Sequence, residues 1–158
     1  MSATVRRAAP GDVPDILRLI RALAAYEREP DAVEATVEML TATLFADGAI
    51  VHAHVAEREG AIVGIAVWFL NYSTWTGKPG LYLEDLFVEA AARGGGVGRA
   101  LLVALAREAV ARGCARMDWA VLDWNEDAMA AYRAVGAKPA AGWQPWRLEG
   151  KALARLAA

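Results

Sequence analysis

Four glycines occur within the six residues Arg93–Gly98, between a predicted strand and a predicted helix. Glycine adopts backbone conformations that other residues avoid, so this segment can turn its N–H groups toward a bound anion. The N-terminus of the following helix adds a partial positive charge, and Arg93 and Arg99 add full charges. The segment therefore predicts a phosphate or pyrophosphate site, with a merely tight strand–helix turn as the alternative.

Two common phosphate-binding motifs do not fit this loop. A nucleotide P-loop requires Lys and then Ser or Thr after its last glycine, whereas Arg99 and Ala100 follow Gly98. The dinucleotide pattern Gly-x-Gly-x-x-Gly/Ala would end on Arg99 or Leu101, depending on which glycine begins it. The loop therefore argues against a nucleotide-binding protein.

The apolar spacing along the chain predicts one domain over residues 1–158, with an α/β fold and a mixed sheet in the order β-α-α-β-β-β-α-β-α-β. The predicted strands are 4–7, 51–56, 62–70, 81–88, 117–122 and 143–149. One helix is predicted at Arg99–Arg112. The other three are predicted to begin at the caps Asp12, Asp31 and Asn125 and to end at Pro30, Gly48 and Gly136.

Composition limits the partners and the compartment. The net charge of -2 argues against bulk binding of nucleic acid or an anionic membrane. The longest apolar run, Ala61–Leu70, is shorter than the roughly 20 residues of a membrane span. One cysteine (Cys114) excludes an internal disulfide, and two histidines are too few for most zinc sites. We therefore expect a soluble, cytoplasmic protein without a metal.

The spacing of Arg93, Gly96 and Gly98 resembles the coenzyme A pyrophosphate loop of the GNAT superfamily of N-acetyltransferases. The order of the predicted elements also matches that fold. Residues 81–85 (LYLED) and 124–126 (WNE), with Tyr132, look like the diamine (spermidine/spermine) N-acetyltransferases, and residues 73–75 (STW) look more like their thialysine-acetylating branch. The resemblance covers essentially the whole chain. It implies acetyl-CoA as co-substrate, a small-molecule amine as acceptor, and a homodimer.

Transfer of an acetyl group from a thioester to an alkylammonium needs a base for the amine, a donor for the oxyanion and an acid for the thiolate. The resemblance implies Glu84 as the general base, through a water, or as an anchor for the ammonium group. It implies Tyr132 as the general acid. Adjacent strand residues point to opposite faces, so we expect Asp85 to play only a structural or supporting role. Without the resemblance, a salt-bridged carboxylate and a packed tyrosine would be the better explanations of Glu84 and Tyr132.

The resemblance also assigns contacts to the two substrates. The implied coenzyme contacts are Leu86, Phe87, Val88, Arg93, Gly94, Gly95, Gly96, Val97, Gly98, Arg99, Asn125 and Ala128. The implied amine contacts, besides Glu84, are Tyr26, Glu27 and Trp75. Polyamine-acetylating members typically have Asp where this chain has Ser73, which favours a thialysine-like amino acid or a short diamine here.

Two other functions stay open at this point. A protein N-terminus or lysine could be the acceptor, although the chain has little spare loop for docking a peptide. A coenzyme A-binding regulatory module without turnover is the other alternative, and the presence of both Glu84 and Tyr132 argues against it.

Overall fold

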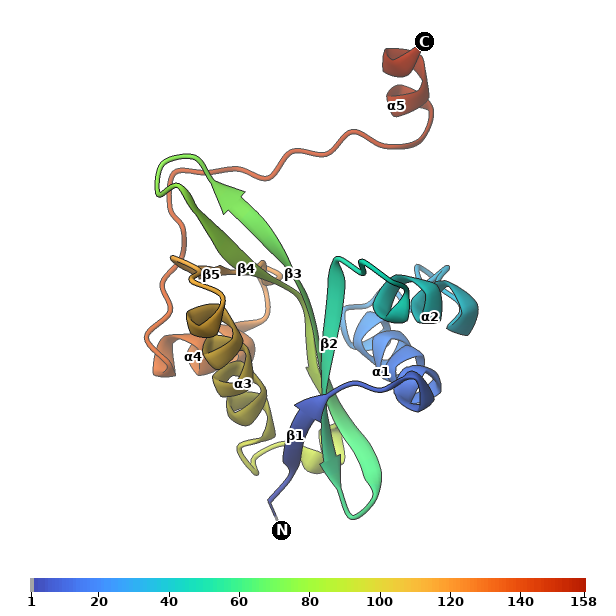
Figure 1. Cartoon of the computed structure of the whole chain (residues 1–158), viewed down its shortest axis with the longest axis vertical. Coiled ribbons are helices and arrows are strands. Elements are labelled where there is room, and N and C mark those ends of the chain that lie inside the picture. Colours follow the sequence, from blue (N-terminus) through green and yellow to red (C-terminus); the bar gives the residue numbers. More distant parts are fainter. Residues whose placement is uncertain (1) are drawn as a thin grey trace. The chain divides into compact units, whose positions relative to one another are not determined.

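A five-stranded sheet, in the order β1-β2-β3-β4-β5, organises the part of the chain that ends at Leu122 (Figure 1). The computed structural model describes residues 2–158. β1 to β4 pair in antiparallel fashion, and β5 lies parallel to β4. This mixed sheet confirms the predicted fold class. The strands are β1 (Thr4–Arg7), β2 (Val51–Arg58), β3 (Ala61–Ser73), β4 (Lys78–Val88) and β5 (Met117–Asp118).

Helices cover both faces of this sheet. α1 (Val13–Tyr26) and α2 (Val37–Phe45) lie together on one side, and α3 (Val97–Ala111) lies on the other (Figure 1). Because side chains alternate along a strand, β2 presents Ala53 and Val55 to α1 and α2 and presents His54 to α3. Two short 3-10 turns, η1 (Pro10–Asp12) and η2 (Ala90–Ala92), precede α1 and α3. The core between the sheet and the first two helices contains Ile16, Leu19, Leu44, Ala53, Val55, Ile62, Ile65, Val67 and Phe87.

The interior of β3 is apolar on both faces. Seven consecutive residues, Ile62–Trp68, are buried, and the Trp68 side chain is fully enclosed. A strand covered by helices on both sides reads as a continuous apolar run rather than as an alternating one. The predicted buried strand at 62–70 is therefore confirmed.

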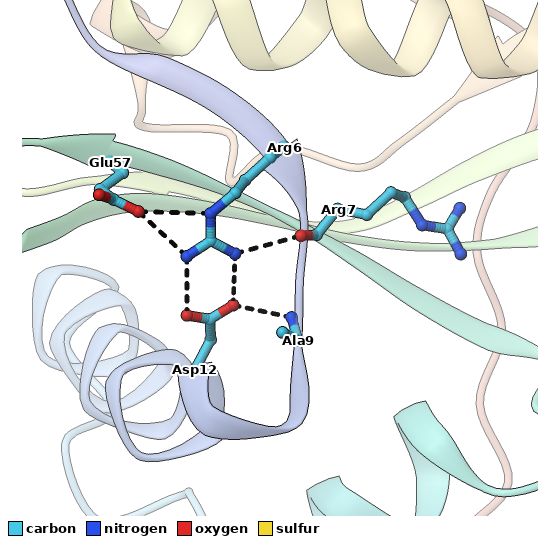
Figure 2. A network of polar contacts seen from close by, with 5 residues as sticks. All are labelled: Arg6, Arg7, Ala9, Asp12 and Glu57. Carbon is cyan, nitrogen blue, oxygen red and sulfur yellow. Dashed lines mark hydrogen bonds and ion pairs between the residues drawn. The ribbon is translucent and has the colours of Figure 1, made fainter. Parts of the chain in front are cut away.

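The start of α1 differs from the prediction. Asp12 precedes the helix, but its backbone is already helical and its carboxylate does not cap α1. The carboxylate instead accepts hydrogen bonds from the Ala9 N–H at 2.7 Å and from the Arg6 guanidinium at 2.7 and 3.0 Å (Figure 2). Arg6 also binds Glu57 at the end of β2, at 3.1 Å. Because the chain enters α1 through η1, the capping position moves back to Ala9, and Asp12 joins the helix start to the sheet.

The start of α2 is also corrected. The predicted cap Asp31 lies outside the helix, which begins six residues later at Val37. Thr36 is the actual cap, because its side chain accepts a hydrogen bond from the Met39 N–H at 3.2 Å. Thr36 has the extended backbone of an N-cap, and its hydroxyl oxygen can accept an N–H bond as the carboxylate of Asp31 could, so residues 31–36 contain two capping signals.

Residues 123–158 form a second compact unit. Its helix α4 (Glu126–Ala134) begins at the predicted cap Asn125, whose side chain accepts a hydrogen bond from the Ala128 N–H at 3.3 Å. The predicted strand at 143–149 is wrong, because those residues have no regular structure, and a helix missed by the sequence reading, α5 (Gly150–Ala157), follows them. The predicted strand at 117–122 contracts to β5. The assignment of the whole chain to one domain stays a prediction.

No helix within residues 2–158 is long and apolar enough to cross a membrane.

Candidate active site

A β-bulge in β4 sets the position of Glu84. In the pairing of β3 with β4, Val67 lies opposite Asp85 and Trp68 lies opposite Leu83, so Glu84 is the extra residue. A bulge bends its strand, twists it locally and redirects side chains. The strict alternation that predicted opposite faces for Glu84 and Asp85 therefore does not hold here. Glu84 is exposed, and Asp85 is half-buried.

Glu27 is brought to the site by the way α1 ends. The Glu29 N–H bonds to the Ala24 carbonyl at 2.9 Å and the Arg28 N–H bonds to the Ala25 carbonyl at 3.1 Å, the pattern of a Schellman motif. Arg28 adopts the left-handed conformation that this motif requires, with φ of 67°. The helix thus ends at Tyr26, before Pro30, which corrects the predicted stop. The motif fixes Tyr26 and Glu27 on the last turn.

Two other carboxylates act on Asp85 at this place. Burial, together with the negative charges of Glu84 and Glu27, raises the pKa of Asp85 to about 6. Burial also raises the pKa of Glu27. The negative charges of Glu27 and Glu84 disfavour the ionised form of Asp85, and a bound ammonium group would stabilise it. The arrangement therefore suits a cationic ligand.

Asp85 is the residue whose part in this group the sequence reading missed. The signal was present, since Asp85 adjoins the singled-out Glu84. Recognising it required knowledge of the bulge, because only a broken alternation lets neighbouring residues act on the same side. No pattern in the local sequence predicts the bulge.

The outer edge of β4 is open beside Glu84. β5 pairs only with Leu81 and Tyr82, and within residues 2–158 no other strand pairs with β4 from Leu83 to Val88 on this side. Unpaired N–H and C=O groups of an edge strand readily bind another extended chain. The predicted contacts Leu86, Phe87 and Val88 lie along this stretch, where the backbone groups that point away from β3 can bind an amide-containing ligand.

The glycine loop has the geometry of an anion site. Gly94 and Gly96 have φ values of 79° and 76°, which side-chain-bearing residues rarely adopt. Gly96 precedes α3, and within the described chain no side chain caps this helix. The first helical N–H groups of Val97, Gly98 and Arg99 precede the first intrahelical bond, from Ala100 to Gly96, so they can bind an anion.

Two further arginines lie at or near this loop. A Cβ added to Gly95 would lie 2.9 Å from Nη2 of Arg58, at the end of β2. The Nε atom of Arg58 is buried, and no hydrogen-bond partner exists for it among residues 2–158. Arg99 is exposed on the first turn of α3. Sequence reading could not find Arg58, because the fold alone brings this hairpin to the loop. The donors and charges present fit a pyrophosphate.

Arg93 contacts the amine side of the site as well as the loop. Its guanidinium lies 4.8 Å from the centre of the Tyr26 ring and 5.3 Å from the centre of the Phe87 ring. Its Nε atom donates a hydrogen bond to the Val88 carbonyl at 2.9 Å. The structure thus brings together Arg93, predicted from the coenzyme loop, and Tyr26, predicted from the amine site.

Other predicted residues lie elsewhere. Trp75 lies in the turn between β3 and β4 and is 88% exposed. Asn125, Ala128 and Tyr132 belong to the second unit, where Asn125 and Ala128 form the cap of α4 and Tyr132 is partly buried on that helix. Their roles toward coenzyme and amine stay predictions. Across residues 2–158, no group of three or more His, Cys, Asp or Glu side chains is arranged to hold a metal ion.

Comparison with known proteins identifies the family of the chain. Residues 16–137 match the acetyltransferase (GNAT) family. The chain belongs to the GNAT family. It is 40% identical to the thialysine N-epsilon-acetyltransferase of Bos taurus, over 97% of this chain and 96% of the relative. It is 30% identical to the L-ornithine N5-acetyltransferase of Arabidopsis thaliana, over 97% and 87% of the two chains.

A solved structure shares the fold of this GNAT protein. An integron cassette protein from the mobile metagenome of V. cholerae superimposes with a TM-score of 0.82 and 27% identity, over 99% of this chain and 98% of that one. The resemblance predicted from the glycine loop and the LYLED segment is confirmed. This GNAT protein is an N-acetyltransferase that acts on amines.

Proposed function

We propose that this enzyme transfers the acetyl group of acetyl-CoA to the primary amine of a small cationic substrate, a thialysine-like amino acid or a short diamine. The observation that carries the proposal is the group of Glu27, Glu84 and Asp85, which lies beside the open edge of β4. An ammonium group bound among them would offset the repulsion that Glu27 and Glu84 exert on Asp85. The match to thialysine and ornithine acetyltransferases supports the same class of acceptor.

The coenzyme is proposed to bind along β4 and over the glycine loop. Its amide-containing arm would pair with the backbone of Leu86–Val88, where β4 has no neighbouring strand. Its pyrophosphate would bind at the N-terminus of α3, among Gly94–Gly98, with Arg93 and Arg99 supplying charge. When bound, it supplies the activated acetyl group. The roles proposed for Asn125 and Ala128 rest on the sequence resemblance.

The chemical step requires three proton transfers. Glu84, through a water, takes a proton from the alkylammonium group, whose pKa of about 10 otherwise leaves no lone pair at neutral pH. The freed amine attacks the thioester carbonyl carbon, and a backbone N–H on the Leu86–Val88 stretch stabilises the oxyanion. The C–S bond then breaks, and the Tyr132 hydroxyl gives its proton to the sulfur. The nitrogen gives up its second proton as the neutral amide forms, and this proton restores the Tyr132 hydroxyl. Tyr132 is assigned this role from the family motif.

The binding of a coenzyme is tested first by thermal stabilisation. Acetyl-CoA at about 100 times its Kd should add about 2.7 kcal/mol to the free energy of unfolding, whereas ATP and NAD should add little. An unchanged melting temperature with every form of coenzyme A would refute the proposal.

The acceptor is tested by release of free thiol with a panel of amines. We expect kcat/KM for thialysine, ornithine or a short diamine to exceed the value for spermine. A preference for spermine would contradict the substrate assignment, and a preference for an N-terminal peptide would favour a protein acceptor instead. The resemblance also supports a cytoplasmic homodimer, for which the solution mass is the direct test.

A further inference from the structure

Arg93 joins three places in the first unit of the fold. Its Nε–H is held by the carbonyl of Val88, at the end of β4. Its guanidinium also lies 5.3 Å from the ring of Phe87, which is 8% exposed and belongs to the core. These two contacts fix the guanidinium relative to the sheet. The third contact is with Tyr26, at 4.8 Å, on the last turn of α1.

The contacts leave part of Arg93 available to an anion. A guanidinium has five N–H donors in one plane, and stacking on aromatic rings uses its faces rather than its edge. The bond to Val88 uses Nε, so the N–H groups on the two Nη atoms still lie at the edge. Arg93 can therefore bind a phosphate oxygen without leaving the ring of Tyr26.

Tyr26 is adjacent in the chain to one of the three carboxylates of the proposed amine site. Glu27 follows it in the chain, and the Schellman motif holds both residues in one turn. The charge of Glu27 acts on Asp85, so the end of α1 borders the proposed amine site. Glu27 therefore moves with Tyr26, so a change in the mobility of Tyr26 also changes the position of the Glu27 carboxylate.

We propose that Arg93 is a positioning residue that couples the coenzyme site to the amine site through its contact with Tyr26. This inference rests on the proposed function. Phosphate bound at the edge of the guanidinium holds Arg93 in place over Tyr26. The end of α1, with Glu27, is then held in the position that receives the ammonium group. Coenzyme A and the amine consequently bind with positive cooperativity.

Calorimetry of coenzyme A binding measures this coupling without turnover, because coenzyme A carries no acetyl group. Its Kd is determined alone and with saturating thialysine. Linkage requires the same coupling factor in both directions. In the wild-type enzyme we expect thialysine to tighten coenzyme A about fivefold or more. In Arg93→Gln this factor should fall to near 1, and Arg93→Lys, which keeps the charge but not the planar edge, should give an intermediate factor.

Arg99→Gln is the matched control. Arg99 is a second arginine at the same loop, exposed on the first turn of α3, whereas Arg93 is the arginine whose guanidinium lies over the Tyr26 ring. Its loss should weaken coenzyme A binding but leave the coupling factor at the wild-type value. Tyr26→Leu should bring the factor to near 1 with Arg93 intact, and Arg93→Gln added to it should lower the factor no further.

The outcomes separate the two proposals. A wild-type enzyme that does not bind coenzyme A would refute the proposed function itself. Binding without any coupling in the wild type, or a full coupling factor in Arg93→Gln or in Tyr26→Leu, would overturn the role of Arg93 and leave the proposed function standing.

Discussion

The indole Nε1 of Trp68 donates a hydrogen bond to Nδ1 of His54 across 3.1 Å, on the sheet face that α3 covers. Trp68 is fully buried and His54 is 5% exposed, so the bond satisfies two polar groups that water cannot reach. Arg7 and Arg112 lie over the same indole ring, at 5.4 and 5.1 Å. Burial and the charge of Arg7 thus favour the neutral histidine, against the opposing charge of Glu108, whose carboxylate lies 3.8 Å from Nε2 of His54.

This contact makes stability depend on pH. Burial, and then the charge of Arg7, lowers the pKa of His54, so the folded protein disfavours the protonated ring. As the pH falls below about 6.5, the His54 imidazole takes up a proton in the unfolded chain but not in the folded chain, and the free energy of unfolding falls. We expect His54→Gln to be less stable than the wild type at pH 7.5 but to lose less on going to pH 5. Urea denaturation at both values checks this, and an unchanged loss would contradict it.

The ionised carboxylate of Asp85 should lower the free energy of unfolding while it helps to bind the amine. Its pKa of about 6 lies above the roughly 3.9 of an unfolded chain, so its ionisation costs folding free energy that builds up between these two pH values and is absent only at about pH 3. Asp85→Asn should therefore raise the free energy of unfolding by about 1–3 kcal/mol at pH 8 and by much less at pH 4. The same variant should raise KM for the amine. A variant that is destabilised at pH 8 would show that the carboxylate has a stabilising partner.

Tyr132 and Glu84 are tested together as acid and base. Tyr132→Phe and Glu84→Gln should each lower kcat by about 10²–10⁴-fold, because each removes one proton transfer. Melting temperatures close to the wild-type value serve as the control for folding. A Tyr132→Phe enzyme with unchanged kcat would remove Tyr132 from the mechanism.

How much the sequence could predict depends on the range of the interactions. The glycine loop, the buried β3 and the cap Asn125 were found because short-range chemistry determines them. The strand predicted at 143–149 failed because its pattern shows only which residues are apolar, whereas a strand also needs an edge to pair with. The bulge at Glu84 and the approach of Arg58 to Gly95 arise from strand pairing across the fold, which no local pattern reports.

The bridge from Asp12 to Arg6 should matter for stability alone. The Arg6 guanidinium lowers the pKa of Asp12, so the stabilisation is present above a pH of about 4 and is lost as the pH falls further. Asp12→Ala should lower the free energy of unfolding by about 1–2 kcal/mol at pH 7, because it breaks a bidentate ion pair and leaves the Ala9 N–H without its acceptor. Asp12→Asn should cost less, since its side-chain oxygen can still accept from Ala9. Chemical denaturation measures both, and equal costs would mean that charge contributes nothing.

Ser73 offers a direct test of acceptor length. Its hydroxyl accepts a hydrogen bond from the Thr76 N–H at 3.3 Å and so shapes the turn between β3 and β4. Aspartate has an acceptor oxygen at the same position, so Ser73→Asp should keep the turn while adding a negative charge. A long polyamine carries further ammonium groups beyond the one that reacts, and the new carboxylate gives one of them a partner. We expect kcat/KM for spermidine to rise about fivefold or more, with little change for thialysine, and Ser73→Asn to give neither effect. Equal gains for Ser73→Asp and Ser73→Asn would show that the shape of the turn, rather than its charge, selects the amine.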